Sequence, residues 1–122
     1  MFLDDLFQVS AVRLEGDTLR ATLLINRGHR IFEGHFPGQP VVPGVCMMQV
    51  VKDLLETHVT RARTRLVRAA QAKFLAMIDP RVTGTVEAEL TVTRGEDIGV
   101  TARLYDQATT FFKYNAVFRT LT

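Results

Sequence analysis

The segment from residue 34 to residue 45 holds the residue types and spacing that could do chemistry. It reads Gly-His-Phe-Pro-Gly-Gln-Pro-Val-Val-Pro-Gly-Val, with three prolines and three glycines. Such a composition fixes an irregular backbone path of the kind that presents a side chain. The path carries His35 to a point just ahead of an expected helix, whose free amides at Gly44 and Val45 favour developing negative charge.

His35 beside such an anion site could remove a proton next to a carbonyl group. Histidine ordinarily titrates near pH ~6.5 and therefore accepts a proton at the pH of a cell. The alternative is a structural or solvated side chain, because a lone histidine in a loop usually has one of these roles. Spacing alone leaves both interpretations open.

The helix that follows is expected over about residues 44–57. Its apolar residues surround the helix, which is typical of a buried helix. The polar residues Gln49, Lys52, Asp53 and Glu56 form one stripe, because they lie three or four positions apart. This stripe is either a solvated face or the polar lining of a site.

The rest of the chain alternates between apolar and polar residues, which indicates half-buried strands. Short turns separate neighbouring strands, and such turns require antiparallel pairing. The pattern predicts two strands, one buried helix and then about four strands, in an α+β domain that covers residues 1–122. The strands with the clearest alternation lie near residues 7–14, 18–26, 83–93, 98–104 and 109–120.

The composition excludes several classes of protein. The chain has 122 residues, 47% of them hydrophobic and 23% charged, which is a globular composition. A net charge of +2 is too small to indicate nucleic-acid binding, and a single cysteine cannot form an internal disulfide. The acidic start does not look like a signal peptide, and the longest apolar run is too short to cross a bilayer. We expect a cytoplasmic protein that neither binds nucleic acid nor inserts into a membrane.

The string of residues 34–45 resembles the signature of the bacterial 3-hydroxyacyl-ACP dehydratases, which have the hotdog fold. Lys73 and Phe74, followed by Pro80, resemble the strand that follows the helix in that family, and the likeness covers roughly residues 7–120. It implies an antiparallel sheet wrapped around one central buried helix. It also implies a dimer joined edge to edge, with active sites at the interface. In that arrangement His35 works with an acid from the partner's helix, and the Gly44 amide holds the thioester carbonyl.

The acid itself departs from the family pattern. The family places Asp or Glu fourteen residues after the histidine, where this chain has Gln49, and often places Gln four residues later, where it has Asp53. Gln49 can donate and accept hydrogen bonds but cannot supply a proton as a general acid. Asp53 would put a carboxylate one turn, about 5.4 Å, further along the helix. Either Gln49 or Asp53 is therefore the candidate group for positioning or protonating the leaving hydroxyl.

Other residues are candidates for binding. Phe36, Gly44, Val45 and Phe74 are expected to contact the acyl substrate, although Phe74 is equally suited to packing in the core. The arginines just beyond the helix are either a solvated surface or a docking site for an acidic carrier protein, because such patches speed encounter with acidic partners. These arginines are Arg61, Arg63, Arg65 and Arg68.

Metal and thiol chemistry have weaker support. His29 and His35, with Glu33, lie close in sequence, but no further ligand is placed nearby, so we expect no metal and no cofactor. Cys46 has no histidine at a spacing that would mark it as a nucleophile, and we expect it to be a small buried residue. Met47 and Met48 are expected in the core.

The function expected from these residues is the dehydration of a 3-hydroxyacyl thioester to the trans-2-enoyl product. The substrate would be carried on acyl carrier protein, in fatty-acid or related acyl-chain biosynthesis. Two alternatives remain: a thioesterase in which a helix carboxylate activates water, and a non-catalytic subunit that binds an acyl carrier or pairs with an active homologue. We expect a homodimer, or a higher oligomer built from it.

Overall fold

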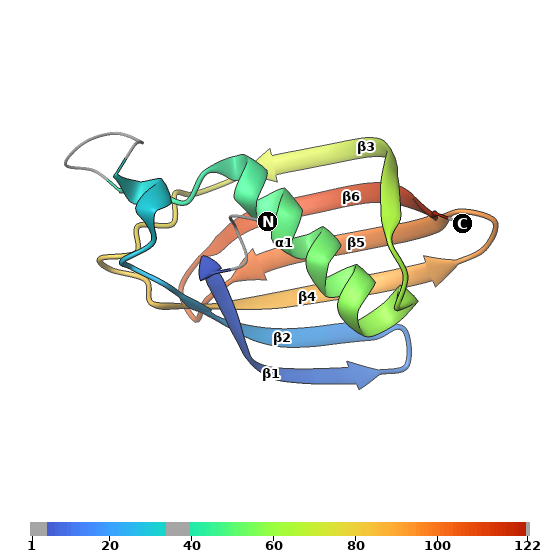
Figure 1. Cartoon of the computed structure of the whole chain (residues 1–122), viewed down its shortest axis with the longest axis horizontal. Coiled ribbons are helices and arrows are strands. Elements are labelled where there is room, and N and C mark those ends of the chain that lie inside the picture. The colour runs from blue at the N-terminus through green and yellow to red at the C-terminus, as the bar shows by residue number, and fades with distance from the viewer. Residues whose placement is uncertain (1–4, 34–39, 122) are drawn as a thin grey trace.

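A computed structural model describes residues 5–33 and 40–121 of the chain. In this part of the chain, six strands and one long helix are connected by short turns and two single-turn helices (Figure 1). The elements in chain order are β1 (Phe7–Glu15), β2 (Thr18–Ile25), η2 (Arg30–Phe32), α1 (Gly44–Leu55), η3 (Glu56–Thr60), β3 (Thr64–Phe74), β4 (Thr85–Arg94), β5 (Ile98–Tyr105) and β6 (Thr110–Thr120).

The strands form one antiparallel sheet in the order β1-β2-β4-β5-β6-β3. Helix α1 lies across one face of this sheet, and β1 and β3 are its two edges (Figure 1). The α+β arrangement predicted from the sequence, with a sheet wrapped around a central helix, is confirmed. The five strands predicted from alternation are also confirmed, with bounds that shift by one or two residues.

The core lies between the sheet and α1. Strands β4 and β5 alternate strictly, with Leu90, Val100 and Leu104 among the side chains that face the helix and are fully or almost fully buried. The helix contributes the buried side chains of the face that packs on the sheet, including Val51 and Leu54. Because each large aliphatic side chain stabilises the fold by about 1.5–3 kcal/mol when buried, this layer holds α1 firmly against the sheet.

Helix α1 ends in a π-helical turn, η3, rather than in a capped α-helical turn. Arg61 follows it with a φ of 52°, in the left-handed region where few non-glycine residues occur. The Glu56 carboxylate accepts hydrogen bonds from the backbone amide of Thr64 and from its hydroxyl, the latter at 2.9 Å. The end of the helix is thus tied directly to the first residue of β3.

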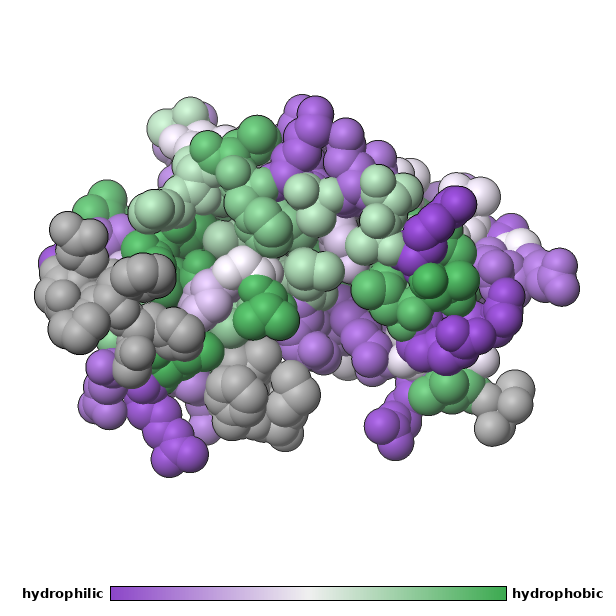
Figure 2. Space-filling view, turned by 90° about the horizontal axis from the view of Figure 1, so that it is seen from above, coloured by the Kyte–Doolittle hydropathy of each residue, from purple (hydrophilic) through white to green (hydrophobic). Residues whose placement is uncertain are grey.

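Strand β3 is an edge strand whose residues after Thr64 are all exposed. Figure 2, which is seen from the β3 side, shows an apolar area there between hydrophilic areas. Two bulges interrupt the pairing of β3 with β6, one between Leu66 and Arg68 and one between Ala69 and Gln71. Because bulges break the two-residue alternation, β3 did not stand out as a strand in the sequence.

Candidate functional site

The start of α1 presents the backbone amides of Gly44 and Val45. The helix is capped by Pro43 in an extended conformation, with no side-chain hydrogen bond. The first recorded bonds are donated to the Pro43 carbonyl by the amides of Cys46 and Met47, at 3.0 and 3.4 Å. Among the described residues, none accepts from the amides of Gly44 or Val45. With the helix dipole, these amides form a site suited to a partial negative charge on oxygen.

Phe74, at the end of β3, packs directly against this helix start. A Cβ atom placed on Gly44 would lie 2.7 Å from Cε1 and 2.9 Å from Cζ of the Phe74 ring, far closer than real contacts. The ring stacks on Phe112 with centroids 4.8 Å apart, and Phe112 stacks in turn on Tyr114. Packing against Phe74 therefore favours glycine at position 44.

Phe74 packs in the core with only part of its ring. One side of its ring packs on the aromatic stack of the core, yet 51% of the residue remains exposed. The exposed part borders the first turn of α1, where Val45 is also 69% exposed. An apolar wall therefore adjoins the free amides, as a site for an acyl chain requires.

Gln49 and Asp53 lie on one side of α1 and are hydrogen-bonded to each other. The Gln49 Nε2 atom donates to Asp53 Oδ1 at 2.8 Å, and both residues are half-buried. The expectation that positions 49 and 53 share one face is thus confirmed. This contact makes the amide a partner that orients the carboxylate, while the carboxylate is the member of the pair that can carry a proton.

A cavity of about 310 Å³ lies beside this pair, between α1, η3 and β1. Its wall is apolar near β1 and polar toward the end of the helix. The lining residues are Phe7, Val9, Cys46, Gln49, Val50, Asp53, Leu54, Glu56, Thr57 and His58.

His58 was missed by the sequence analysis. It lines the cavity together with Thr57, and both residues belong to the π turn that follows α1. Periodicity of 3.6 residues cannot reveal such a placement. The one feature of the sequence that could have indicated His58 is that it is a titratable residue at the end of a helix expected to be buried.

Cys46 is buried, as expected, and burial raises the pKa of its thiol. The thiol therefore stays protonated at neutral pH, which does not suit a nucleophile. Met47 is buried in the core and Met48 packs against it from a half-buried position, which confirms both expectations.

The remaining candidates are spread over the molecule. His35 and Phe36 lie outside the described residues. His29 is buried, and its Nδ1 accepts a hydrogen bond from the Ile31 amide at 3.0 Å, so it caps η2.

The four arginines of the expected docking site are all exposed. Arg61 and Arg63 lie in the connection that precedes β3, whereas Arg65 and Arg68 lie on β3 itself.

Neither a metal centre nor a membrane span is found in the described ranges. Within residues 5–33 and 40–121, no group of three or more His, Cys, Asp or Glu side chains is arranged to hold a metal ion. No helix in these ranges is long and apolar enough to cross a bilayer.

Several solved structures have the same fold as this chain. The dehydratase heterocomplex ApeI:P from Xenorhabdus doucetiae contains a chain with a TM-score of 0.75 and 19% identity, over 93% of this chain and 97% of that one. The (R)-hydratase from A. caviae gives a TM-score of 0.68 and 18% identity, over 91% and 100%. A putative thioesterase from Ralstonia eutropha gives 0.64 and 17%, over 92% and 83%. These likenesses establish the hotdog fold.

The sequence comparison points to one family. No curated protein matches the sequence. The model of the ApeI-like family, described as ApeI dehydratase, matches residues 11–113, which span most of the sheet together with α1. The chain therefore belongs to the ApeI-like family of hotdog dehydratases.

Proposed function

We propose that this protein removes water from a 3-hydroxyacyl thioester, carried on acyl carrier protein, to give the trans-2-enoyl thioester in fatty-acid or related acyl-chain biosynthesis. The observation that carries the proposal is the start of α1. There the amides of Gly44 and Val45 have no acceptor among the described residues, and Phe74 packs beside them. A thioester carbonyl bound at these amides would have its developing charge stabilised while its chain contacts the aromatic ring.

The proposed reaction uses three groups of the chain. His35 takes the proton from C2, and the electron pair moves toward the carbonyl oxygen held by the Gly44 amide. The pair then forms the C2–C3 double bond as the C3–O bond breaks. Asp53, oriented by its hydrogen bond from Gln49, gives the proton with which the hydroxyl leaves as water. The proton on His35 returns to Asp53 through solvent.

The proposed site is completed by a second copy of the chain. Strand β3 is a free edge, exposed along its length, and a free edge readily pairs with another strand. Antiparallel pairing of two β3 strands would bring the helix of one protomer toward the loop of the other. We therefore propose a homodimer in which His35 of one protomer works with the Gln49–Asp53 pair of its partner.

The test is turnover of defined substrates by the purified protein. A dehydratase converts a 3-hydroxyacyl thioester to an enoyl product that absorbs in the ultraviolet, without release of free thiol, and His35→Ala abolishes this conversion. Release of thiol without enoyl product would instead indicate a thioesterase, in which Asp53 activates water from its position in the cavity wall. Full dehydratase activity in His35→Ala would refute the catalytic assignment.

A further inference from the structure

A row of charged side chains crosses all six strands on the face of the sheet opposite α1. Residues that pair directly across antiparallel strands point to the same face, so the strand register identifies the row. Only one of its members is acidic. From β1 to β3 the row contains Arg13, Arg20, Glu89, Arg103, Lys113 and Lys73.

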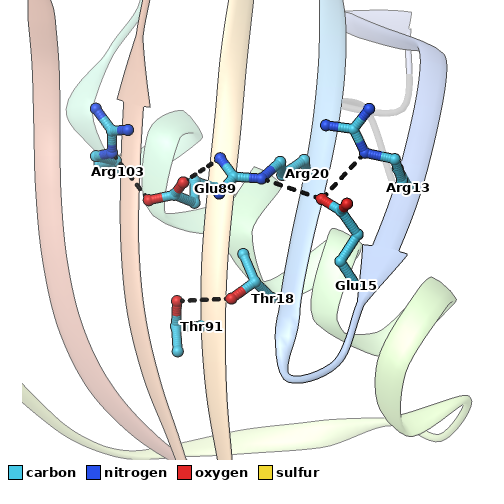
Figure 3. Close-up of polar contacts among 7 residues, drawn as sticks. All are labelled: Arg13, Glu15, Thr18, Arg20, Glu89, Thr91 and Arg103. Carbon is cyan, nitrogen blue, oxygen red and sulfur yellow. Dashed lines mark hydrogen bonds and ion pairs between the residues drawn. The ribbon is translucent and has the colours of Figure 1, made fainter.

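Most of the positive charge in the half of the row on β1, β2, β4 and β5 is balanced within the sheet (Figure 3). Glu15 contacts Arg13 at 3.1 Å and Arg20 at 3.5 Å. Glu89 lies between Arg20 and Arg103, and its hydrogen bond from Arg103 is the main cause that lowers its pKa. In this half, two carboxylates therefore form ion pairs with three guanidinium groups.

The half on β6 and β3 has less compensation. Lys113 and Lys73 face each other directly, and neither has a salt bridge within the described part of the chain. Arg65 lies opposite Arg119, but the Asp97 carboxylate is bonded to Arg119, at 2.7 Å. Like charges placed directly opposite each other on a sheet are unfavourable. Arg65 shares the Asp97 carboxylate with Arg119, because the charge of Arg65 also helps to lower the pKa of Asp97. We call the group Arg65, Arg68, Lys73 and Lys113, in which positive charge exceeds negative charge, the cationic patch.

The two bulges of β3 build this patch. Simple alternation from Arg65 would turn Arg68 toward the helix side, but the bulge at Val67 places Arg68 opposite Val117, on the outer face. The second bulge, at Ala70, restores the original phase, so that Lys73 points outward and Phe74 points toward Gly44. Bulges re-aim side chains in this way at functional positions.

The patch and the proposed site lie on opposite faces of the same strand, β3. Lys73 and Phe74 are consecutive residues, so the patch ends where the opposite face of β3 contacts the start of α1. Pairing of two β3 edges would leave this outer face uncovered. A partner bound to the patch would therefore lie on the outer face of β3, behind the residues that contact the start of α1, without blocking the dimer edge.

We propose that the cationic patch is the docking surface for an acidic protein, the carrier that delivers the acyl thioester. The inference rests on the proposed function for the identity of the cargo. Charge complementarity selects an acidic partner. In the other half of the row, Glu15 and Glu89 offset two of the three guanidinium charges, so the excess positive charge is concentrated on β6 and β3. A short patch of this kind fits a compact acidic surface better than an extended nucleic-acid backbone.

The experiment compares two double variants that each remove two positive charges. Arg68→Gln/Lys113→Gln acts on the patch, and Arg61→Asn/Arg63→Gln acts on the neighbouring arginines outside it. All four side chains are exposed, so both variants should fold, which thermal unfolding checks. Binding of purified acyl carrier protein is titrated at low and moderate salt. Turnover is measured with carrier-bound and with small thioester substrates.

The patch variant should bind the carrier about tenfold more weakly, with a flatter salt dependence, and should turn over the small substrate normally. The control variant should match the wild type. Equal weakening in both variants, or unchanged carrier binding in the patch variant, would overturn the proposal. The proposal would also be overturned if the patch variant lost affinity for duplex DNA while its affinity for the carrier was unchanged. Because binding is measured without turnover, an inactive protein would refute the proposed function and leave the docking result decisive.

Discussion

Gly44 and Phe74 form a matched pair at the start of α1, and a double-mutant cycle can measure their coupling. We predict that Gly44→Ala destabilises the fold by about 1 kcal/mol, because overpacking costs about 1–3 kcal/mol and the gain in helix propensity offsets about 0.5–1 kcal/mol of it. Phe74→Leu shortens the side chain and removes the ring atoms that Cβ would meet. The double variant should therefore lose less stability than the sum of the single variants, as measured by urea unfolding. Additive losses would show that the ring does not restrict position 44 in solution.

The Gln49–Asp53 pair allows a test of which residue supplies the proton. We predict that Asp53→Asn lowers turnover about 100-fold, a loss typical of removing a general acid, because the amide keeps the shape but not the proton. Gln49→Glu should help little or cause harm, since it places a second carboxylate against the first. Steady-state kinetics with a 3-hydroxyacyl thioester measures both. A rise in activity in Gln49→Glu, with little effect of Asp53→Asn, would show that the general acid belongs at position 49 and that Asp53 does not replace it.

The sequence predicted these two side chains on one helix face, but not the contact between them. Spacing of four residues fixes a shared face, whereas the rotamers that join Nε2 to Oδ1 depend on the half-buried surroundings of the cavity. His58 was out of reach for a different reason. Its place on the cavity wall depends on a π turn, which a pattern based on α-helical periodicity does not reveal.

At the scale of elements, alternation predicted β4 and β5 well and β3 poorly. Each of the first two has one buried and one solvated face, so their sequences repeat every second residue. Strand β3 has exposed residues on both faces and two bulges, and both features erase the pattern. The same bulges set the outward direction of Arg68, so the sequence cluster of arginines could not reveal which of them share a surface.

Glu89 joins β2, β4 and β5, and its charge should make the sheet sensitive to acid. Its folded-state pKa lies below the ordinary value of 4.5, chiefly because Arg103 donates a hydrogen bond to it, with a further contribution from Arg20. A group with a depressed folded pKa contributes stability above its unfolded pKa, and this contribution is lost as pH falls through the folded value. We predict that the stability difference between wild type and Glu89→Gln is constant near neutral pH and shrinks below about pH 4.5.

Urea unfolding across pH 3–7 measures this difference. Glu96→Gln is a suitable control, because Glu96 lies in the exposed turn between β4 and β5 and has no salt bridge within the described residues. A difference for Glu89→Gln that stays constant down to pH 3 would show that the ion pairs with Arg20 and Arg103 contribute nothing to stability.

At the scale of the whole molecule, one chain places only part of the proposed site. The amides of Gly44, the ring of Phe74 and the Gln49–Asp53 pair belong to a single helix and the strand edge beside it. The order of elements predicted a sheet packed around one helix, and the resemblance of residues 34–45 to the dehydratase signature implied the hotdog fold. How two chains meet is a property of surfaces rather than of periodicity, so it requires a separate test.

The two edges of the sheet provide that test, because each carries a valine of nearly equal exposure. Val67 on β3 is 39% exposed and Val12 on β1 is 40% exposed. We predict that the protein at micromolar concentration has twice the 13.7 kDa mass of one chain by light scattering. Val67→Lys should shift it to the monomer mass and abolish turnover, because a charge on a pairing edge opposes strand addition. Val12→Lys should remain dimeric and active if β3 is the joining edge. A monomeric wild type would contradict the shared site, and dissociation by Val12→Lys alone would move the interface to β1.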